Sequence, residues 1–175
     1  MYLEQLLEQV SRGDEDSFRR LYDQTSGKIH AIALMMLKNG ESAEEVVQET
    51  YLKIWRQAPS YDRKKGTAMA WMTTIVRRQA IDRIRSIQRQ GKTEGALSEQ
   101  AELLVEDIVN ARTDLDHHIW SCINRLAAER ATLILLAFFA GYTHEELAEN
   151  MNKPLGTVKS SIRRGLMSLK ECLEI

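Results

Sequence analysis

The segment from 143 to 170 carries cations and short hydroxyl side chains at a spacing suited to binding nucleic acid. Between positions 153 and 170 the sequence has five Lys or Arg and no Asp or Glu. Cations neutralise phosphates, and hydroxyl and guanidinium groups can also reach base edges. We therefore predict a DNA contact surface formed by Thr157, Lys159, Ser160, Arg163 and Arg164. The alternative is a charged helix face that meets only solvent.

Two short helices joined by a tight turn are expected to position these side chains. Thr143 followed by Glu146 has the pattern of a capping box, in which each side chain satisfies a backbone N–H at the helix start. Pro154 cannot continue this helix, and Gly156 is expected to let the backbone turn before the next one. The second helix should bury a stripe formed by Val158, Ile162, Leu166 and Leu169. The pattern is typical of a helix-turn-helix.

A second basic region combines a loop with a long helix. The helix is predicted to begin at or near Thr67 and to turn five arginines outward, which would follow a phosphate backbone. These are Arg77, Arg78, Arg83, Arg85 and Arg89, and the same helix should bury Trp71, Ile75, Ile81, Ile84 and Ile87. In the loop before it, Tyr61 stands among Arg63, Lys64 and Lys65, an arrangement that could hold an unstacked base. An ordinary solvated loop has the same composition.

Net charge alone does not indicate a nucleic-acid ligand, but its distribution does. The 175 residues sum to a net charge of -1. From 61 to 92 there are nine Lys or Arg against two acids, whereas from 93 to 118 there are seven acids against one arginine. Segments of opposite charge therefore alternate along the chain, and the acidic one is rich in Gly and polar residues. We expect it to be a linker.

The residues that could support a metal or a reaction are few. Cys122 and Cys172 form no CxxC pair, and no amino-terminal leader is evident, so a cytoplasmic protein is expected. His118 and Cys122 share a helix face, but two ligands are too few to predict a metal site. Neither a cofactor nor a catalytic cluster is predicted. The apolar run LILLAFFAGY is too short to cross a membrane.

The whole chain is predicted to be all-α, with two small helical domains joined by an acidic linker. The domains span 1–90 and 113–175, and the linker spans 91–112, with one short helix possible at 101–109. In the first domain, Gly13 should end a helix, Asp14 should cap the next, and Gly27 should separate that one from a third. Ser42 with Glu45 is expected to form another capping box.

These blocks, in this order, resemble the extracytoplasmic function (ECF) group of bacterial sigma factors, within the sigma-70 family. The resemblance spans nearly the whole chain and rests on three strings: SAEEVVQETYLKIWR, YDRKKGTAMAWMTTIVRRQAIDRIRS and, most diagnostic, GTVKS. It implies an initiation factor that binds core RNA polymerase, through its beta and beta-prime subunits, and promoter DNA. It also implies an anti-sigma factor as partner.

The resemblance assigns roles to individual residues. Glu45, Gln48 and Glu49 match positions that contact the coiled coil of the large catalytic subunit, although spacing alone favours simple solvent exposure for Gln48 and Glu49. The minus-ten element would be contacted by Tyr61, Arg63, Lys64, Lys65, Arg77, Arg78, Arg83 and Arg85. The minus-thirty-five element would be contacted by the helix-turn-helix residues given above.

The chain also departs from the family pattern. Ile75 and Val76 align with a tryptophan pair that wedges open the duplex in housekeeping sigma factors, which predicts weaker melting and stricter promoter choice. Ser161 stands where many relatives have a cation, which predicts one missing phosphate contact. The acidic linker could pass through the polymerase's RNA path or be a plain tether. The rival functions are an autonomous dimeric helix-turn-helix regulator and, third, an enzyme.

Overall fold

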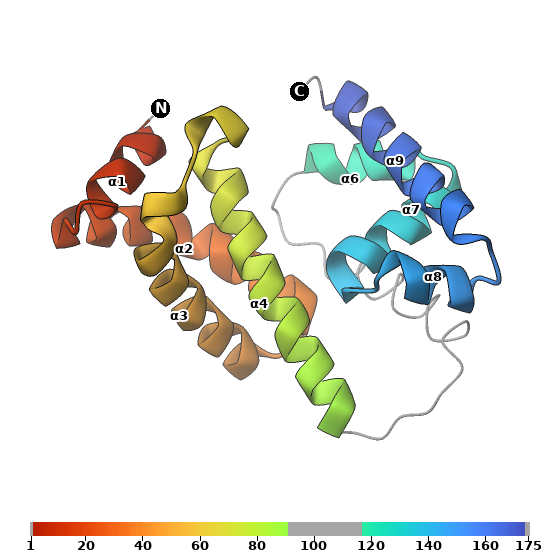
Figure 1. The fold of residues 1–175 in the computed structure, drawn as a ribbon, viewed down its shortest axis with the longest axis horizontal. Helices are drawn as coiled ribbons and strands as arrows, with labels where there is room; N and C mark the ends of the chain where they lie inside the picture. Colours follow the sequence, from red (N-terminus) through yellow and green to blue (C-terminus); the bar gives the residue numbers. More distant parts are fainter. Residues whose placement is uncertain (1, 91–116, 174–175) are drawn as a thin grey trace. The chain divides into compact units, whose positions relative to one another are not determined.

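The chain folds into two helical units, which we describe from a computed structural model (Figure 1). The structure describes residues 2–90 and 117–173, and within these ranges no strand is present. The first unit comprises Met1–Arg89 and the second Gln90–Ile175. The predicted linker at 91–112, its possible short helix and the residues up to 116 lie outside the described residues. The all-α class is confirmed.

The first unit is built from four α-helices and two short 3-10 turns. They are α1 (Tyr2–Val10), α2 (Glu15–Leu37), α3 (Gly40–Gln57), η1 (Ala58–Ser60), η2 (Arg63–Lys65) and α4 (Ala68–Gln90). Helix α2 packs against both α1 and α3. Helix α1 ends at Val10, and Gly13, which was predicted to end it, lies in the turn that follows, with a φ of 86°. As predicted, Asp14 caps α2 by accepting hydrogen bonds from the backbone of Asp16 and Ser17.

Two predicted boundaries in this unit are wrong. Gly27 does not separate two helices, because α2 continues through it with its buried side in phase: Leu21 and Thr25 before it, Ile29 after it. A single glycine costs a helix only about 1 kcal/mol, which packing can offset. Ser42 does not cap α3 either. Asn39 does so, accepting from the Ser42 backbone N–H at 2.8 Å, and Ser42 lies buried in the first turn.

The core of the first unit joins α1, α2, α3 and α4. Among its fully buried side chains are Leu7, Leu21, Ile29, Ile54, Met72 and Val76. One polar link crosses this core, a 2.7 Å hydrogen bond between the Thr25 and Tyr51 hydroxyls. Burial raises the pKa of Tyr51 to about 12, so the phenol stays neutral at any ordinary pH.

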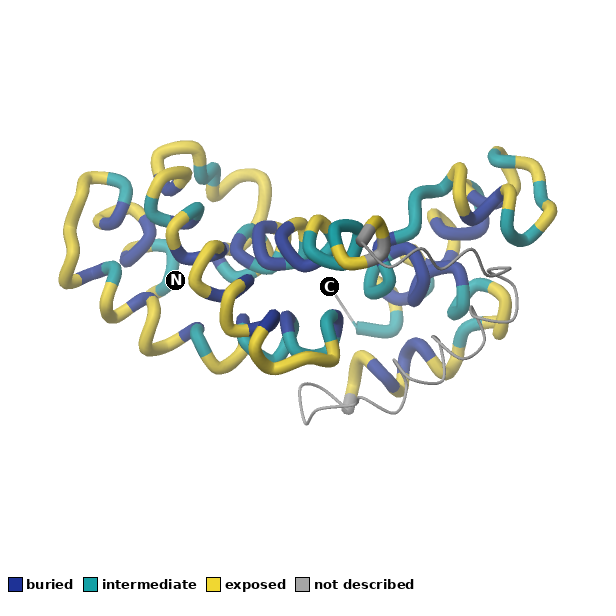
Figure 2. Tube along the Cα trace, turned by 90° about the horizontal axis from the view of Figure 1, so that it is seen from below, coloured by how far each residue is buried: buried dark blue, intermediate teal, exposed yellow. Residues whose placement is uncertain are grey.

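The buried face of α4 differs from the predicted stripe. Its buried residues are Ala68, Met72, Ile75, Val76, Gln79 and Ala80, which repeat at the spacing of one helix face. Of the predicted set, Ile75 is buried, Trp71, Ile81 and Ile84 are partly exposed, and Ile87 is 48% exposed. Besides Met72, Ile75 and Val76, small or polar residues face the core here, while several large apolar ones are partly exposed. Figure 2 shows how buried and exposed residues alternate along the helices.

The second unit contains α6 (His117–Asn124), α7 (Ala128–Leu135), the π-helical turn η3 (Leu136–Ala140), α8 (His144–Asn150) and α9 (Leu155–Cys172). Its core gathers Leu133, Leu136, Ala137, Leu147, Ala148, Val158 and Ile162. The predicted capping box is confirmed. The Thr143 hydroxyl accepts from the Glu146 N–H at 3.1 Å, and the Glu146 carboxylate accepts from the Thr143 N–H at 2.6 Å.

The turn between α8 and α9 is made differently from the prediction. The left-handed residue is Asn152, with a φ of 53°, whereas Gly156 lies inside the first turn of α9. Asparagine tolerates this conformation better than most residues. The Lys153 ammonium also lies 2.6 Å from the Glu129 carboxylate, an ion pair that ties the turn to α7.

Helix α9 packs closely against α7. Val158, Ile162 and Leu169 are buried as predicted, but Leu166 is 38% exposed. Gly165 takes the inward position, and a Cβ atom there would lie 2.6 Å from the Cδ1 atom of Ile134. A side chain at position 165 would therefore require the end of the Ile134 side chain to move, so glycine fits the packing as it stands.

Candidate nucleic-acid and protein interfaces

The outer face of α9 carries the side chains predicted to contact duplex DNA. Thr157, Lys159, Arg163 and Arg164 are exposed, and Ser160 is partly exposed. Ser160 and Arg164 are linked: the Arg164 guanidinium donates to the Ser160 carbonyl at 3.3 Å and to its hydroxyl at 3.2 Å. The opposite side of the same helix is in the core, so the exposed face is fixed in direction.

Two further observations concern which residues belong to the exposed face of α9. The Lys159 ammonium lies 3.5 Å from the Glu145 carboxylate on α8. The pKa of Glu145 is lowered, first by a hydrogen bond from its own backbone N–H and then by Lys159. The family resemblance places Ser161 where many relatives have a cation, but Ser161 is only 8% exposed, so its side chain is not part of the exposed cationic face.

The arginines of α4 are divided between solvent and the body of the unit. Arg78 is exposed, whereas Arg77, Arg83 and Arg85 are partly buried. Burial lowers the pKa of Arg77, and the neighbouring Arg78 adds to this. The Arg83 guanidinium forms a 2.8 Å ion pair with the carboxylate of Glu45 on α3. The structure thus joins two residues that the sequence assigned to different surfaces.

The loop before α4 is an ordered turn with cations at its tip. Arg63, Lys64 and Lys65 are exposed on η2, and Asp62 caps that turn by accepting from the Lys64 N–H at 2.9 Å. The Asp62 carboxylate also lies 3.7 Å from the Lys65 ammonium. Tyr61 is partly exposed and lies against the ring of Trp71.

The exposed side of α3 carries the predicted protein-contact residues. Glu45, Gln48 and Glu49 are all exposed, as the prediction requires. Gln48 lies at the rim of an open hollow of about 440 Å³ between α2 and α3, together with Tyr22, Ser26, Gly27, His30, Glu44 and Val47. The exposed side chain of Leu52 follows along the same helix. The surface is acidic and partly apolar, which suits a protein partner better than DNA.

Comparison with known proteins covers both units. Residues 21–90 match the Sigma-70 region 2 family and residues 117–169 match the Sigma-70, region 4 family. The ECF RNA polymerase sigma factor SigK of Mycobacterium ulcerans (strain Agy99) is 32% identical over 175 residues, covering 98% of this chain and 94% of the relative. SigK of Mycobacterium sp. (strain KMS) is 35% identical over 176 residues, with coverage of 98% and 90%.

This chain belongs to the ECF sigma factors of the sigma-70 family. Sigma factors give RNA polymerase its promoter specificity and catalyse no reaction themselves. Among solved structures, the chain is similar to CnrH in complex with the cytosolic domain of CnrY, with a TM-score of 0.47, 18% identity and coverage of 99% and 98%. The sigma factor RpoE in complex with the anti-sigma factor NepR from Bartonella quintana gives a TM-score of 0.40, 22% identity and coverage of 90% and 97%.

Two residues of this sigma factor that were aligned with a duplex-opening tryptophan pair lie in its core. Ile75 is 6% exposed and Val76 is fully buried. Their side chains face the core of the first unit and do not reach its surface. The two residues therefore do not form a surface pair that could stack on bases, and this reason for expecting weaker melting does not hold.

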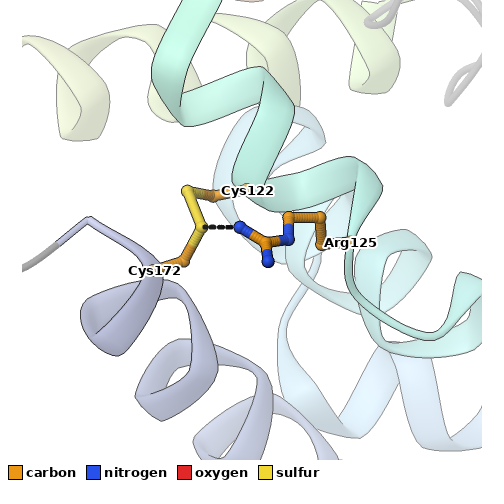
Figure 3. The surroundings of a disulfide bond; sticks show 3 residues. All are labelled: Cys122, Arg125 and Cys172. Atoms are coloured by element: carbon orange, nitrogen blue, oxygen red, sulfur yellow. Dashed lines mark hydrogen bonds between the residues drawn. A yellow bond between two sulfur atoms is a disulfide. The ribbon is translucent and has the colours of Figure 1, made fainter.

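A disulfide in the second unit of the sigma factor was missed from the sequence. Cys122 on α6 and Cys172 at the end of α9 are bonded, with Cα atoms 5.8 Å apart and a sequence separation of 50 (Figure 3). The Arg125 guanidinium points at the Cys172 sulfur from 3.8 Å. Neither the cysteine spacing nor any local motif signals this pair, since only the packing of α6 on α9 brings the two together.

The disulfide also removes the metal ligand considered for this region. Cys122 is 1% exposed and its sulfur is already bonded, so it cannot coordinate a metal together with His118. Among residues 2–90 and 117–173, no group of three or more His, Cys, Asp or Glu side chains is placed to hold a metal ion. Within the same ranges, no helix is long and apolar enough to cross a membrane.

Proposed function

We propose that the two units of this sigma factor have separate tasks at a promoter. The first domain, predicted to span 1–90, would bind core polymerase and the opened minus-ten element, and the linker predicted at 91–112 would connect it to the second domain. The second, predicted to span 113–175, would bind the minus-thirty-five element as duplex. The observation that carries this proposal is the division of α9 into a buried apolar side and an exposed side bearing Lys159, Arg163 and Arg164.

The polymerase contact is assigned to the exposed side of α3. Glu45, Gln48 and Glu49 would meet cationic and polar groups of the beta-prime coiled coil, with further contacts to the beta subunit. Of the three, Glu49 is the simplest candidate, because it is exposed, whereas the Glu45 carboxylate is already paired with Arg83. This support comes from exposure and charge, which complement a basic partner surface.

The minus-ten contacts are assigned to the loop and to α4. The exposed cations of η2 would hold the displaced strand, and the arginines of α4 would follow its backbone. Promoter opening itself would draw on the energy of these single-strand contacts, because flipping a base costs about a few kcal/mol. The protein would act in the cytoplasm, where its polymerase partner is found.

An anti-sigma factor is proposed as the regulatory partner. In the solved structures, RpoE is bound to the anti-sigma factor NepR and CnrH is bound to the cytosolic domain of CnrY. For this chain, the support is membership of the ECF group. A pull-down from the native host, with the full chain as bait, would identify the partner.

Transcription with core polymerase and a promoter library tests the function directly. Sequencing the transcripts should show starts enriched at promoters that share a minus-thirty-five and a minus-ten motif. The rival, a dimeric helix-turn-helix regulator, predicts tight binding to duplex DNA without polymerase, at two half-sites about one helical turn apart. That outcome, with no promoter-specific transcript, would refute the proposal.

A further inference from the structure

The loop at 61–67 is held closed by contacts that converge on Tyr61. The Tyr61 hydroxyl donates to the carbonyl of Gly66 at 2.9 Å, which joins the first part of the loop to its end. The Tyr61 ring lies against the Trp71 ring on α4, with centroids 5.6 Å apart and planes inclined by 57°. One side chain therefore fastens the loop both to itself and to the helix that follows.

Backbone geometry around the loop supports the same closed shape. The Lys65 N–H donates to the Asp62 carbonyl at 2.9 Å, which forms the turn that carries the cations. Gly66 has a φ of 151°, a conformation that other residues rarely adopt, and its carbonyl is the one that accepts from Tyr61. Beyond the loop, the Ala68 N–H donates to the Glu4 carboxylate of α1 at 3.2 Å, which anchors the start of α4.

These contacts involve both the hydroxyl and the ring of Tyr61. Its hydroxyl has a partner within the loop, and its ring already contacts an aromatic neighbour. Burial raises the pKa of Tyr61, and the nearby Glu4 carboxylate raises it further, so the phenol remains a hydrogen-bond donor. The three exposed cations of η2 lie between Tyr61 and Gly66, on the segment that this hydrogen bond closes.

We propose that Tyr61 is a positioning residue, which sets the shape of the loop so that Arg63, Lys64 and Lys65 meet the opened promoter strand, and that it is not itself the stacking platform for a base. This inference rests on the proposed function of the first unit. It changes the role given to Tyr61 from the sequence, and it makes the hydroxyl, not the ring alone, the group on which promoter opening depends.

The discriminating variant is Tyr61→Phe in the full-length chain, because it keeps the ring and removes only the hydroxyl. Losing one hydrogen bond should reduce promoter opening by about threefold to tenfold, measured with core polymerase on a promoter that the wild type uses. Backbone amides of 61–67 should exchange with deuterium faster in the free variant. Binding to core polymerase and to minus-thirty-five duplex should not change.

Two comparison variants separate the possible roles. Tyr2→Phe makes the same chemical change on the exposed surface of α1 and should match the wild type. Tyr61→Leu removes the ring as well and should reduce opening at least as much as Tyr61→Phe. The proposal predicts that the exchange rate of the loop and the loss of opening rise together across this series.

Three results would overturn the proposal. If Tyr61→Phe opens promoters like the wild type while Tyr61→Leu does not, the ring stacks on a base and the hydroxyl is irrelevant. If loop exchange is unchanged in Tyr61→Phe, the hydroxyl does not hold the loop. If exchange rises but opening does not fall, loop shape does not matter for the cations. A wild-type chain that yields no promoter-specific transcript instead refutes the proposed function, a failure seen before any variant is made.

Discussion

Breaking the Cys122–Cys172 bond should cost the second unit much of its stability. The bond closes a loop of 50 positions, and cross-linking a loop of that length removes enough unfolded-chain entropy to stabilise the fold by about 4 kcal/mol. For a unit of this size, about 1 kcal/mol shifts the melting temperature by roughly 4–8 °C. We therefore expect Cys122→Ser or Cys172→Ser to lower the melting temperature of the second unit by about 15 °C or more.

Thermal unfolding of the full chain, followed by calorimetry with and without dithiothreitol, measures this effect. Trp120 reports on the second unit, since it is 7% exposed and stacks on Phe139, while the other two tryptophans lie in the first unit. The wild type should lose stability on reduction, whereas Cys172→Ser should be insensitive to reductant. A reduced wild type whose second unit melts within about 3 °C of the oxidised form would refute the loop-entropy argument.

Three further changes have defined outcomes. Arg163→Ala should weaken binding to minus-thirty-five duplex by about tenfold, with core polymerase binding intact; loss of both in a folded variant would contradict separable units. Gly165→Ala should change the stability of the second unit by less than about 1 kcal/mol in chemical denaturation, because the helix propensity of alanine offsets the cost of displacing the end of the Ile134 side chain, and a loss of more than about 2 kcal/mol would show that Ile134 cannot move. Thr143→Ala should cost about 1 kcal/mol by the same measurement, since it removes the cap of α8, and Thr143→Ser should restore most of it.

Features that depend on a few neighbouring residues could be predicted from the sequence. The capping box of Thr143 and Glu146 and the cap at Asp14 are local hydrogen-bonding patterns, and both are confirmed. Local patterns fail where two caps compete within one turn. Asn39 lies three residues before Ser42, so either could start α3, and the structure uses the earlier one.

Buried faces were harder to predict where small or polar residues face the core. On α4 the inward positions include Ala68, Gln79 and Ala80, while the large side chain of Ile87 is exposed. A hydrophobicity pattern follows the large side chains and so selects the wrong stripe. Gly165 on α9 shows the same effect, since a close helix crossing needs a small residue where apolar spacing would place Leu166.

Contacts between distant parts of the chain could not be predicted at all. The disulfide joins residues 50 positions apart and depends on how α6 lies on α9. The exposure of the candidate contact residues on α3 and α9 agrees with their predicted roles, but no sequence pattern indicates that Glu45 pairs with Arg83. That pairing requires α3 and α4 to be packed together.

The Glu45–Arg83 ion pair makes the proposed polymerase face and the proposed promoter face thermodynamically linked. A partner that engages the Glu45 carboxylate competes with the Arg83 guanidinium 2.8 Å away, and a phosphate that engages Arg83 competes with Glu45. Linkage is reciprocal, so each ligand changes the affinity for the other by the same factor. Because both side chains are 41–54% exposed, the coupling energy is at most about 1 kcal/mol, which corresponds to about fivefold in affinity.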